Sequence, residues 1–494
     1  MPPVVQAFAN QRIAELTRRA RADLDMLSFA TKQWVIPKQH NGRKMLDVVI
    51  IGAGQSGLVV GHALKRRGVT NVLLLDRNPA GYEGVWETYA RNYEIRSPKD
   101  ITGADLGIPS LSIQSFFEAK HGPDAWAGIK RVPRTDWMDY LRWYRSIADL
   151  PIENGVEVID IAYDASGVTL TTKDGSAIRS RFVVLATGMD GGGAWAVPPS
   201  FSDNLPPERF NHSSDIIDAE TLRGRRIGIL GAGAAAFDIA VTALTHGAST
   251  VEIHMRRASL PMVDAAREME HGGGLDHGHE LSDATKWALS RFMSGLSQSP
   301  AEHHFLKAWS FPNFRMQLGS PWDEIGLDGD DVRVMTPKGE YRFDRVFAAT
   351  GVSVDMSMRP ELGKIAAKAA LWRDRFVPPA DDPSPRRLNF PYLDRCYRFT
   401  EREPGTAPGI ERIYAFNALA SMSMGGMSAV SISSHRFGVP RLATGITGAL
   451  FAEQEDAVIP TLMAYRTPGI VLPPHVREAL GLPPEADGQM ASVG

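Results

Sequence analysis

Residues 47–57 read DVVIIGAGQSG, and residues 226–236 read RIGILGAGAAA. Each stretch begins with a β-branched run, turns through glycines and ends in small, apolar residues of helical character, which predicts a strand, a tight turn and a helix. A second pair of similar stretches follows, RFVVLATG at 181–188 and DRVFAATG at 344–351. Each predicts a strand that ends in an Ala-Thr-Gly turn. The repeat favours two copies of one βα unit, as in doubly wound parallel sheets.

These four landmarks predict the fold class and the order of the domains. We expect an α/β protein with two doubly wound, Rossmann-like dinucleotide-binding domains, the second inserted in the first. The expected parts are a helical preface at 1–45, the first part of the first domain at 46–195, the second domain at 196–350 with an irregular helical insertion at 260–330, and the return of the first domain with a C-terminal segment at 351–494. Residues 152–180 alternate apolar and polar side chains between glycine turns, which predicts antiparallel strands.

Composition excludes several classes of protein. The 54 Lys and Arg residues nearly balance the 57 Asp and Glu residues, so nothing indicates a nucleic-acid or anionic-membrane partner. Cys396 is the single cysteine, which excludes an intrachain disulfide and a redox CxxC pair. The apolar runs are far shorter than the roughly 20 residues that span a bilayer, and the N-terminus has no apolar region like that of a signal peptide. We expect a cytoplasmic protein with small-molecule partners; homo-oligomerisation stays open.

The first glycine turn, residues 52–57, matches the dinucleotide-binding fingerprint. Gly52 permits the tight turn, Gly54 lets a pyrophosphate approach the backbone, and Gly57 allows the helix to pack closely on the strand. The following strand ends at Asp76, where a carboxylate is expected on a ribose hydroxyl, and Arg77 is expected beside it. A structural turn without a ligand is the alternative, and it is disfavoured because so many parts of the fingerprint are met.

The second glycine turn, residues 231–236, has the same pattern with alanine in the third position. Gly231, Gly233 and Ala236 satisfy the fingerprint, which accepts this alanine. The next strand ends at Arg256 and Arg257 instead of an acid. A guanidinium at that place can bind the 2′-phosphate of NADPH through two parallel hydrogen bonds. A solvated pair of arginines is the alternative, and the position of the pair favours NADPH.

Two weaker features lie elsewhere. The stretch EHGGGLDHGHE contains His271, His277 and His279, which suggest metal ligands. A polar, mobile loop is the favoured interpretation, because no cysteine and no helical spacing accompany the histidines. No metal is therefore expected. Residues 421–426 read SMSMGG before an apolar helical stretch. Backbone amides there are expected either to face a flavin ring or to form an ordinary helix cap.

Taken in order, the motifs resemble those of the class B flavoprotein monooxygenases, which comprise flavin-containing, N-hydroxylating and Baeyer–Villiger monooxygenases. The matching features are GAGQSG, the GVW at 84–86, GAGAAA with its arginines, and both ATG turns. The stretch HSSD at 212–215 lies where the family has its signature histidine. The rest of that signature differs, because Pro206 and Glu208 replace its Phe and Gly and Ile216 replaces its aromatic residue.

The resemblance implies FAD at the first glycine turn and NADPH at the second, and an oxygen atom transferred from a C4a-(hydro)peroxyflavin to a small organic substrate. It assigns Trp86 to FAD and His212 to NADPH and the flavin chemistry. Arg96 is expected either as an active-site cation or as part of a structural ion pair. N- or S-oxygenation is favoured, with Baeyer–Villiger oxidation open. The alternatives are an FAD-dependent NADPH oxidoreductase or oxidase without oxygen insertion, and a cofactor-sensing protein without catalysis.

Overall fold

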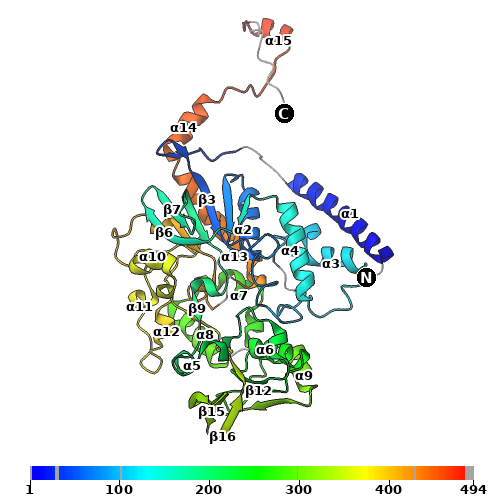
Figure 1. The fold of residues 1–494 in the computed structure, drawn as a ribbon. Helices are drawn as coiled ribbons and strands as arrows, with labels where there is room; N and C mark the ends of the chain where they lie inside the picture. The colour runs from blue at the N-terminus through cyan, green and yellow to red at the C-terminus, as the bar shows by residue number, and fades with distance from the viewer. Residues whose placement is uncertain (1–2, 28–32, 101–102, 297–298, 427–429, 484–494) are drawn as a thin grey trace. The chain divides into compact units, whose positions relative to one another are not determined.

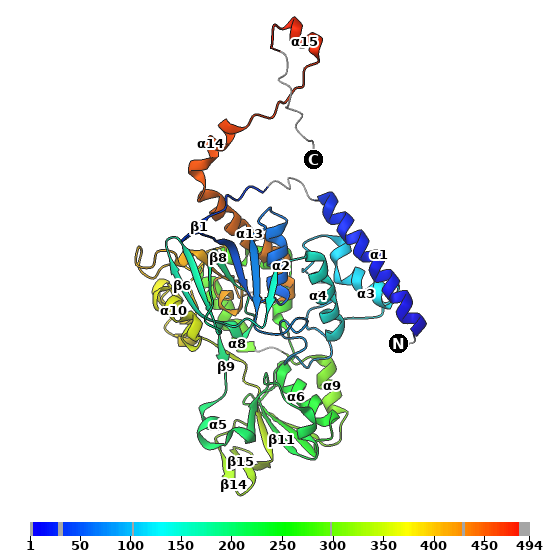
Figure 2. The same cartoon turned by 45° about the horizontal axis from the view of Figure 1, so that its top comes forward.

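The computed structural model describes residues 3–27, 33–100, 103–296, 299–426 and 430–483, and the chain divides into two units, 1–447 and 448–494. The larger unit contains two separate, largely parallel sheets (Figures 1 and 2). The first sheet has the strand order β5-β4-β3-β8-β7-β6, with β19 also paired to β8. Its strands are β3 (Leu46–Ile51), β4 (Val72–Asp76), β5 (Ile152–Asn154), β6 (Val158–Asp164), β7 (Gly167–Thr172), β8 (Ala177–Leu185) and β19 (Ile413–Ala415).

The pairing in the first sheet follows the expected pattern. β3 lies between β4 and β8 and is parallel to both. The strands β6, β7 and β8 are antiparallel neighbours, as predicted for 152–180. The helices of this part are α2 (Gln55–Lys65), α4 (Arg134–Ala148) and α13 (His435–Ala452), and the N-terminal α1 (Pro3–Leu27) packs against α3 (Ile113–His121).

The second sheet is parallel throughout and has the order β10-β17-β11-β12-β13. Its strands are β10 (Phe210–His212), β11 (Arg226–Leu230), β12 (Thr250–His254), β13 (Phe314–Gln317) and β17 (Arg345–Ala348). Helices α6 (Ala234–Thr245) and α9 (Glu302–Trp309) lie side by side (Figures 1 and 2) and bury Phe237 against the sheet. A buried phenylalanine contributes roughly 1.5–3 kcal/mol, so this apolar core holds the domain together.

A short ribbon connects the two sheets. β9 (Gly193–Trp195) precedes the strands of the second sheet, β18 (Val352–Val354) follows them, and the two pair antiparallel. The second domain is therefore an insertion in the first, and the expected α/β fold with two Rossmann-like domains is confirmed.

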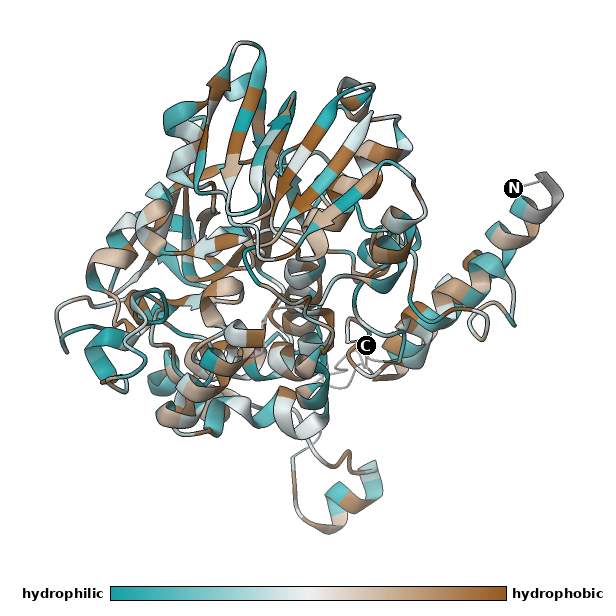
Figure 3. Cartoon of the chain, turned by 90° about the horizontal axis from the view of Figure 1, so that it is seen from below, coloured by the Kyte–Doolittle hydropathy of each residue, from teal (hydrophilic) through white to brown (hydrophobic). Residues whose placement is uncertain are grey.

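The expected helical insertion at 260–330 is helical only in its first part. It contains α7 (Gly272–His277), α8 (Asp283–Leu296) and α9, whereas β13 belongs to the second sheet and β14 (Glu324–Asp328) begins an antiparallel meander with β15 (Asp331–Thr336) and β16 (Gly339–Phe343). Buried and partly buried residues alternate along β15, and apolar and polar residues alternate along strands in Figure 3. This period of two belongs to a sheet with one covered face.

The unit 448–494 contains α14 (Glu455–Ala464) and α15 (Pro474–Ala479), and neither helix has a buried residue. In the part of the chain that the structure describes, no helix combines the length and the apolar character needed to cross a membrane.

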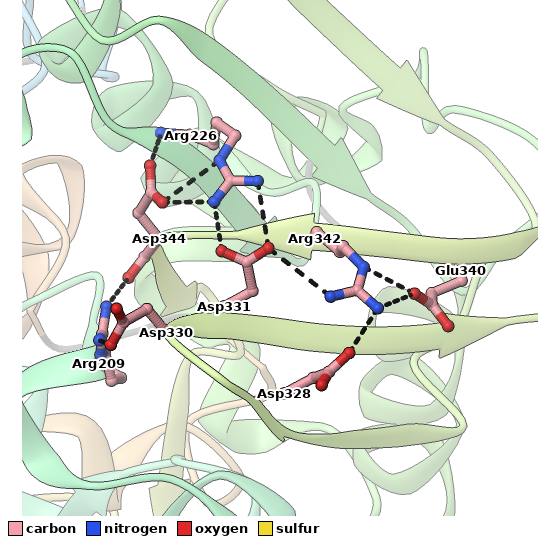
Figure 4. Close-up of polar contacts among 8 residues, drawn as sticks. All are labelled: Arg209, Arg226, Asp328, Asp330, Asp331, Glu340, Arg342 and Asp344. Carbon is pink, nitrogen blue, oxygen red and sulfur yellow. Dashed lines mark hydrogen bonds and ion pairs between the residues drawn. The ribbon is translucent and has the colours of Figure 1, made fainter.

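A network of charges ties the meander to the second sheet (Figure 4). Arg226 at the start of β11 donates to Asp344 at 2.6 Å and to Asp331 at 2.5 Å, and the other oxygen of Asp344 accepts the Arg226 amide at 2.7 Å. The network continues through Arg342, which pairs with Asp328 and Glu340. Arg226 holds the pKa of Asp344 below its ordinary value, because the ion pair favours the charged carboxylate.

We predict that Asp344→Ala lowers the free energy of unfolding by about 1–2 kcal/mol at pH 7, since it removes charge-assisted bonds of a partly exposed pair. The pKa of Asp344 is lower in the folded protein, so this stabilisation is present above about pH 4 and is lost as the pH falls. Denaturant unfolding at pH 7 and pH 3 measures both effects. Glu340→Ala, at the exposed side of the network, is the control; an equal loss in the two variants would contradict the prediction.

Candidate functional site

The two glycine turns are built alike, around a contact with an Ala-Thr-Gly turn. Gly52 and Gly231 have φ of 101° and 116°, a region that favours glycine. A Cβ on Gly52 would lie 2.4 Å from the Ala186 carbonyl oxygen, and one on Gly231 would lie 2.3 Å from that of Ala349. Ala186 and Ala349 are the first residues of the two ATG turns, so the repeats seen in the sequence meet in space.

The first glycine turn leaves the start of α2 open to an anion. Gly54 is the residue before α2; no described side chain caps this helix, and its first turn has no acidic residue. The unpaired amides and the helix dipole favour a phosphate there. A Cβ on Gly54 would lie 3.3 Å from Cα of Gly84, and one on Gly57 would lie 1.8 Å from the Gly52 oxygen. The fingerprint glycines thus have the close approaches that the sequence predicts, and the GVW segment covers the turn.

Asp76 lies at the end of β4, as expected, and contacts the first glycine turn itself. Its two carboxylate oxygens accept the Ala53 amide and the Asn78 amide, each at 2.8 Å. Burial raises the pKa of Asp76, while these two amides oppose the shift. Arg77 is more exposed and pairs with Asp190 at 3.2 Å. Asp76 therefore stabilises the turn, and its contact with a ribose stays a prediction.

Trp86 closes the same turn from the side of α4. Its ring lies edge-on to Trp137, with centroids 6.3 Å apart, and its carbonyl accepts a hydrogen bond from Arg134. Trp137 in turn donates to the Gln55 side chain in the first turn of α2, at 3.2 Å. The GVW segment and the start of α2 are therefore held in one arrangement.

The second glycine turn also opens onto an uncapped helix. Gly233 precedes α6, no described side chain caps it, and the first turn of the helix has no acidic residue. Ala236 is fully buried. The Gly52 amide donates to the Leu75 carbonyl, and the Gly231 amide donates to the His254 carbonyl, so Leu75 and His254 are equivalent positions. The next residue is Asp76 in the first unit and Met255 in the second. The second site therefore lacks the acid that would oppose a 2′-phosphate.

The two arginines after β12 have different roles. Arg257 donates to the carbonyls of Leu296 at 2.9 Å and Ser294 at 3.3 Å, at the C-terminal end of α8. A cation at this end of a helix is stabilising. Arg256 is exposed, and the described part of the chain offers its guanidinium no hydrogen bond or ion pair. Arg256 is therefore the arginine available to a phosphate. The sequence predicted the same role for both arginines, because it does not show that Arg257 binds the end of α8.

His212 lies at the carboxyl end of β10, where it pairs in register with Ala348 beside the second ATG turn. The ring is almost fully buried and stacks on Trp195 with centroids 5.2 Å apart. Its Nδ1 accepts the Ser214 amide at 3.1 Å. Burial lowers the pKa of His212, with Asp215 opposing, so the imidazole is neutral at pH 7. The residue lies where the connecting ribbon meets the second sheet.

Arg96 takes part in an ion pair. Its guanidinium lies 3.4 Å from Asp264 and donates to the Ser299 carbonyl at 3.2 Å, and its own carbonyl accepts from Arg267. Burial lowers the pKa of Arg96 and Asp264 opposes the shift. This geometry matches the structural alternative left open by the sequence; a catalytic role stays a prediction.

The histidine-rich stretch is helical instead of a loop. His271 caps α7 by accepting the Gly274 amide at 3.2 Å, and the segment reaches residues 421–426, because a Cβ on Gly425 would lie 2.4 Å from the Gly278 oxygen. The described residues include no group of three or more His, Cys, Asp or Glu side chains placed to hold a metal ion. Gly278 and Gly425 therefore allow the two stretches to pack closely.

Sequence reasoning missed a histidine–aspartate pair beside the second glycine turn. His304 on α9 contacts Asp238 on α6, with Nδ1 2.6 Å from the carboxylate, and the ring is almost fully buried. No spacing rule relates these two residues, which are distant in the sequence and belong to different helices. The pair is visible only in the folded protein.

Comparison with known proteins gives the family. A model of the pyridine nucleotide-disulphide oxidoreductase family matches residues 49–267. The FAD-dependent urate hydroxylase of Xanthomonas campestris pv. campestris is 39% identical over 455 residues, which cover 92% of this chain and 96% of that enzyme. The ornithine hydroxylase from Pseudomonas aeruginosa has a TM-score of 0.61 at 19% identity, and the ornithine N-hydroxylase of Kutzneria sp. 744 has 0.64 at 17%; each match covers 83% of this chain and 100% of the other.

Two glycine turns that each begin an uncapped helix define an oxidoreductase with two dinucleotide sites. The full-length similarity narrows the class, and the chain belongs to the class B flavin-dependent monooxygenases. The predicted resemblance is thus confirmed, and with it an enzyme that depends on FAD and NADPH. The structural likenesses, at under 20% identity, support the fold alone.

We predict that Gly233→Ala weakens NADPH binding about tenfold or more while the protein keeps its stability and its FAD. A Cβ on Gly233 meets nothing within 4 Å in the protein, so only a bound pyrophosphate would be obstructed. Titration calorimetry with NADPH and thermal unfolding measure the two effects. Gly326→Ala, which also meets nothing within 4 Å, is the control in the same domain. Unchanged NADPH affinity in Gly233→Ala would contradict the assignment.

Proposed function

We propose that this enzyme hydroxylates urate, or a purine closely similar to urate, at the expense of NADPH and O₂. The observation that carries the proposal is the 39% identity to an FAD-dependent urate hydroxylase over nearly the whole of both chains. The overall reaction would convert urate, O₂, NADPH and a proton into hydroxylated urate, water and NADP⁺. One oxygen atom enters the substrate and the other leaves as water.

The geometry of the two glycine turns supports a separate site for each cofactor. The residues assigned to FAD are Gly52, Gly54, Gly57, Asp76, Arg77 and Trp86. The residues assigned to NADPH are Gly231, Gly233, Ala236, Arg256 and His212. The amides at the start of α2 and α6 bind the two pyrophosphates, because both helices lack a side-chain cap and an acid in their first turn.

The bound flavin supplies the redox and oxygen chemistry, and the protein orients the reactants and keeps water away. Gly54 gives the pyrophosphate access to the backbone, and Trp86 covers the turn from the side of α4. His212 is neutral and stacked on Trp195, so it contributes polar ring atoms without a positive charge. Its Nδ1 is occupied by the Ser214 amide, which fixes the ring in one orientation.

The choice of reaction differs from the one that the sequence favoured. The sequence predicts N- or S-oxygenation and leaves Baeyer–Villiger oxidation open. The urate relative favours ring hydroxylation instead, because its identity is about twice that of the ornithine hydroxylases. The second candidate is an oxidoreductase or oxidase without oxygen insertion. A dithiol mechanism does not suit this candidate, since Cys396 is the single cysteine and burial raises the pKa of its thiol.

We predict that urate, among a panel of purines, amines, sulfides and ketones, gives the largest acceleration of NADPH oxidation. NADPH, O₂ and urate should disappear in equal amounts, and ¹⁸O₂ should place one ¹⁸O atom in the product. An oxygen electrode, absorbance and mass spectrometry measure these quantities.

Two results would contradict this proposal in different ways. Acceleration by ornithine or a sulfide, with urate inert, would replace the substrate and keep the monooxygenase. Hydrogen peroxide as the sole oxygen product with every compound would favour the oxidase.

We predict that Arg256→Ala raises the Kd for NADPH about tenfold to a hundredfold and leaves that for NADH nearly unchanged. The reason is the loss of a charge-assisted contact with the 2′-phosphate, which is worth about 1.5–3 kcal/mol. Arg257→Ala is the matched control, because its guanidinium is already bound to carbonyls of α8. It should lower thermal stability with little change in the NADPH-to-NADH ratio. Equal effects on that ratio in both variants would contradict the distinction between them.

A further inference from the structure

We propose that residues 89–99, here called the docking loop, set the alignment of the two domains for the reduction of the flavin by NADPH. In this proposal His304 and Asp238 are positioning residues that hold the loop to the second domain. The inference rests on the proposed function, because it takes FAD and NADPH to bind at the two glycine turns. It adds a role for residues that neither the motifs nor the proposed cofactor contacts include.

One side of the docking loop is attached to the first domain. The loop begins three residues after Trp86, and its backbone pairs with the segment that leads into α4. The Tyr93 carbonyl accepts the Arg134 amide at 2.8 Å, and the Ile95 amide donates to the Val132 carbonyl at 2.9 Å. The loop is therefore fixed relative to the segment that covers the first glycine turn.

The other side of the loop is attached to the second domain through one imidazole. The Tyr93 amide donates to Nε2 of His304 at 3.2 Å, and Nδ1 of His304 lies 2.6 Å from Asp238. Since Nε2 accepts this bond, Nδ1 is the ring nitrogen that donates a proton to the carboxylate. Asp238 belongs to α6, the helix that begins at the second glycine turn. A short chain of bonds thus joins the docking loop to the NADPH-binding helix.

Two further contacts hold the loop near the connecting ribbon. Tyr89 lies edge-on to Trp195 at 5.2 Å between centroids, and Trp195 stacks on His212. Arg91 donates to the Ser213 carbonyl at 2.6 Å and to the Asp215 carbonyl. The loop therefore contacts the second domain at two places, at α9 and directly after β10.

This arrangement matters for the rate because a misplacement of about 1 Å between reacting groups costs about a hundredfold. The His304 ring is almost fully buried and its two hydrogen bonds are partly buried, so only a side chain that keeps an acceptor at the place of Nε2 can replace it. Loss of the pair would leave each glycine turn intact. We therefore expect slower flavin reduction with little change in the affinity for either cofactor.

The experiment compares His304→Ala with His303→Ala. His303 is the matched control, because it is exposed on the same helix, and its ring contacts the rings of Tyr93 and His304 without taking part in the bonds to the Tyr93 amide and Asp238. In FAD-loaded protein without O₂, His304→Ala should slow flavin reduction at saturating NADPH about tenfold to a hundredfold. The FAD content and the Kd for NADPH should change less than about threefold. Before NADPH is added, amide hydrogen exchange in residues 90–95 should become faster in His304→Ala alone.

Conservative variants separate positioning from a general loss of stability. His304→Gln keeps an acceptor at the place of Nε2 and should restore most of the rate. Asp238→Asn keeps an acceptor for Nδ1, so its flavin should be reduced faster than that of Asp238→Ala. Asp238→Ala also tests the proposal if His304→Ala does not fold. Wild-type rates in His304→Ala and Asp238→Ala would overturn the inference, as would equal slowing by His303→Ala. If NADPH fails to reduce the wild-type flavin, the proposed function itself is contradicted.

Discussion

The rest of the molecule depends on the contact between the first glycine of each Rossmann turn and the carbonyl of an Ala-Thr-Gly turn. At 2.4 and 2.3 Å from a hypothetical Cβ, these carbonyls leave no space for any other residue. The contact fixes the central strand next to its parallel neighbour, because the Ala186 and Ala349 amides donate to Ile51 and Leu230. The following helix then begins above the carboxyl end of the sheet, where an anion is bound best.

If the two helix starts bind the two cofactors as proposed, their cofactors must also meet in one reaction, and the glycine turns alone do not ensure this. The second domain is joined to the first by the two short strands β9 and β18. With so short a ribbon between them, the two domains are restrained from rotating mainly by the contacts that other residues make between them. Trp195 on β9 lies between Tyr89 and His212, and Arg91 binds the carbonyls that follow His212. His212 thus belongs to the contact between the domains, and its contact with a cofactor stays a prediction.

The parts that the sequence predicted correctly are those in which a few neighbouring residues determine the conformation. The glycine turns, the antiparallel strands at 152–180 and the inserted order of the domains follow from local patterns and their repetition. The strand β13 was not predicted, since it is defined by its pairing with β12 and buries only Phe314. The different roles of Arg256 and Arg257 depend on where α8 ends, and the His304–Asp238 pair depends on the packing of two helices. No local pattern encodes these distances.

The difference between the two turns supports the proposal that they bind two different dinucleotides. In the first unit Asp76 accepts the Ala53 amide, so a carboxylate occupies the end of the second strand. In the second unit Met255 takes this position, and the exposed Arg256 follows it. A carboxylate at this place would repel a 2′-phosphate, and an arginine attracts it. Because Arg257 binds the end of α8, the proposed selection of NADPH depends on Arg256, and Arg257 fixes the helix beside it.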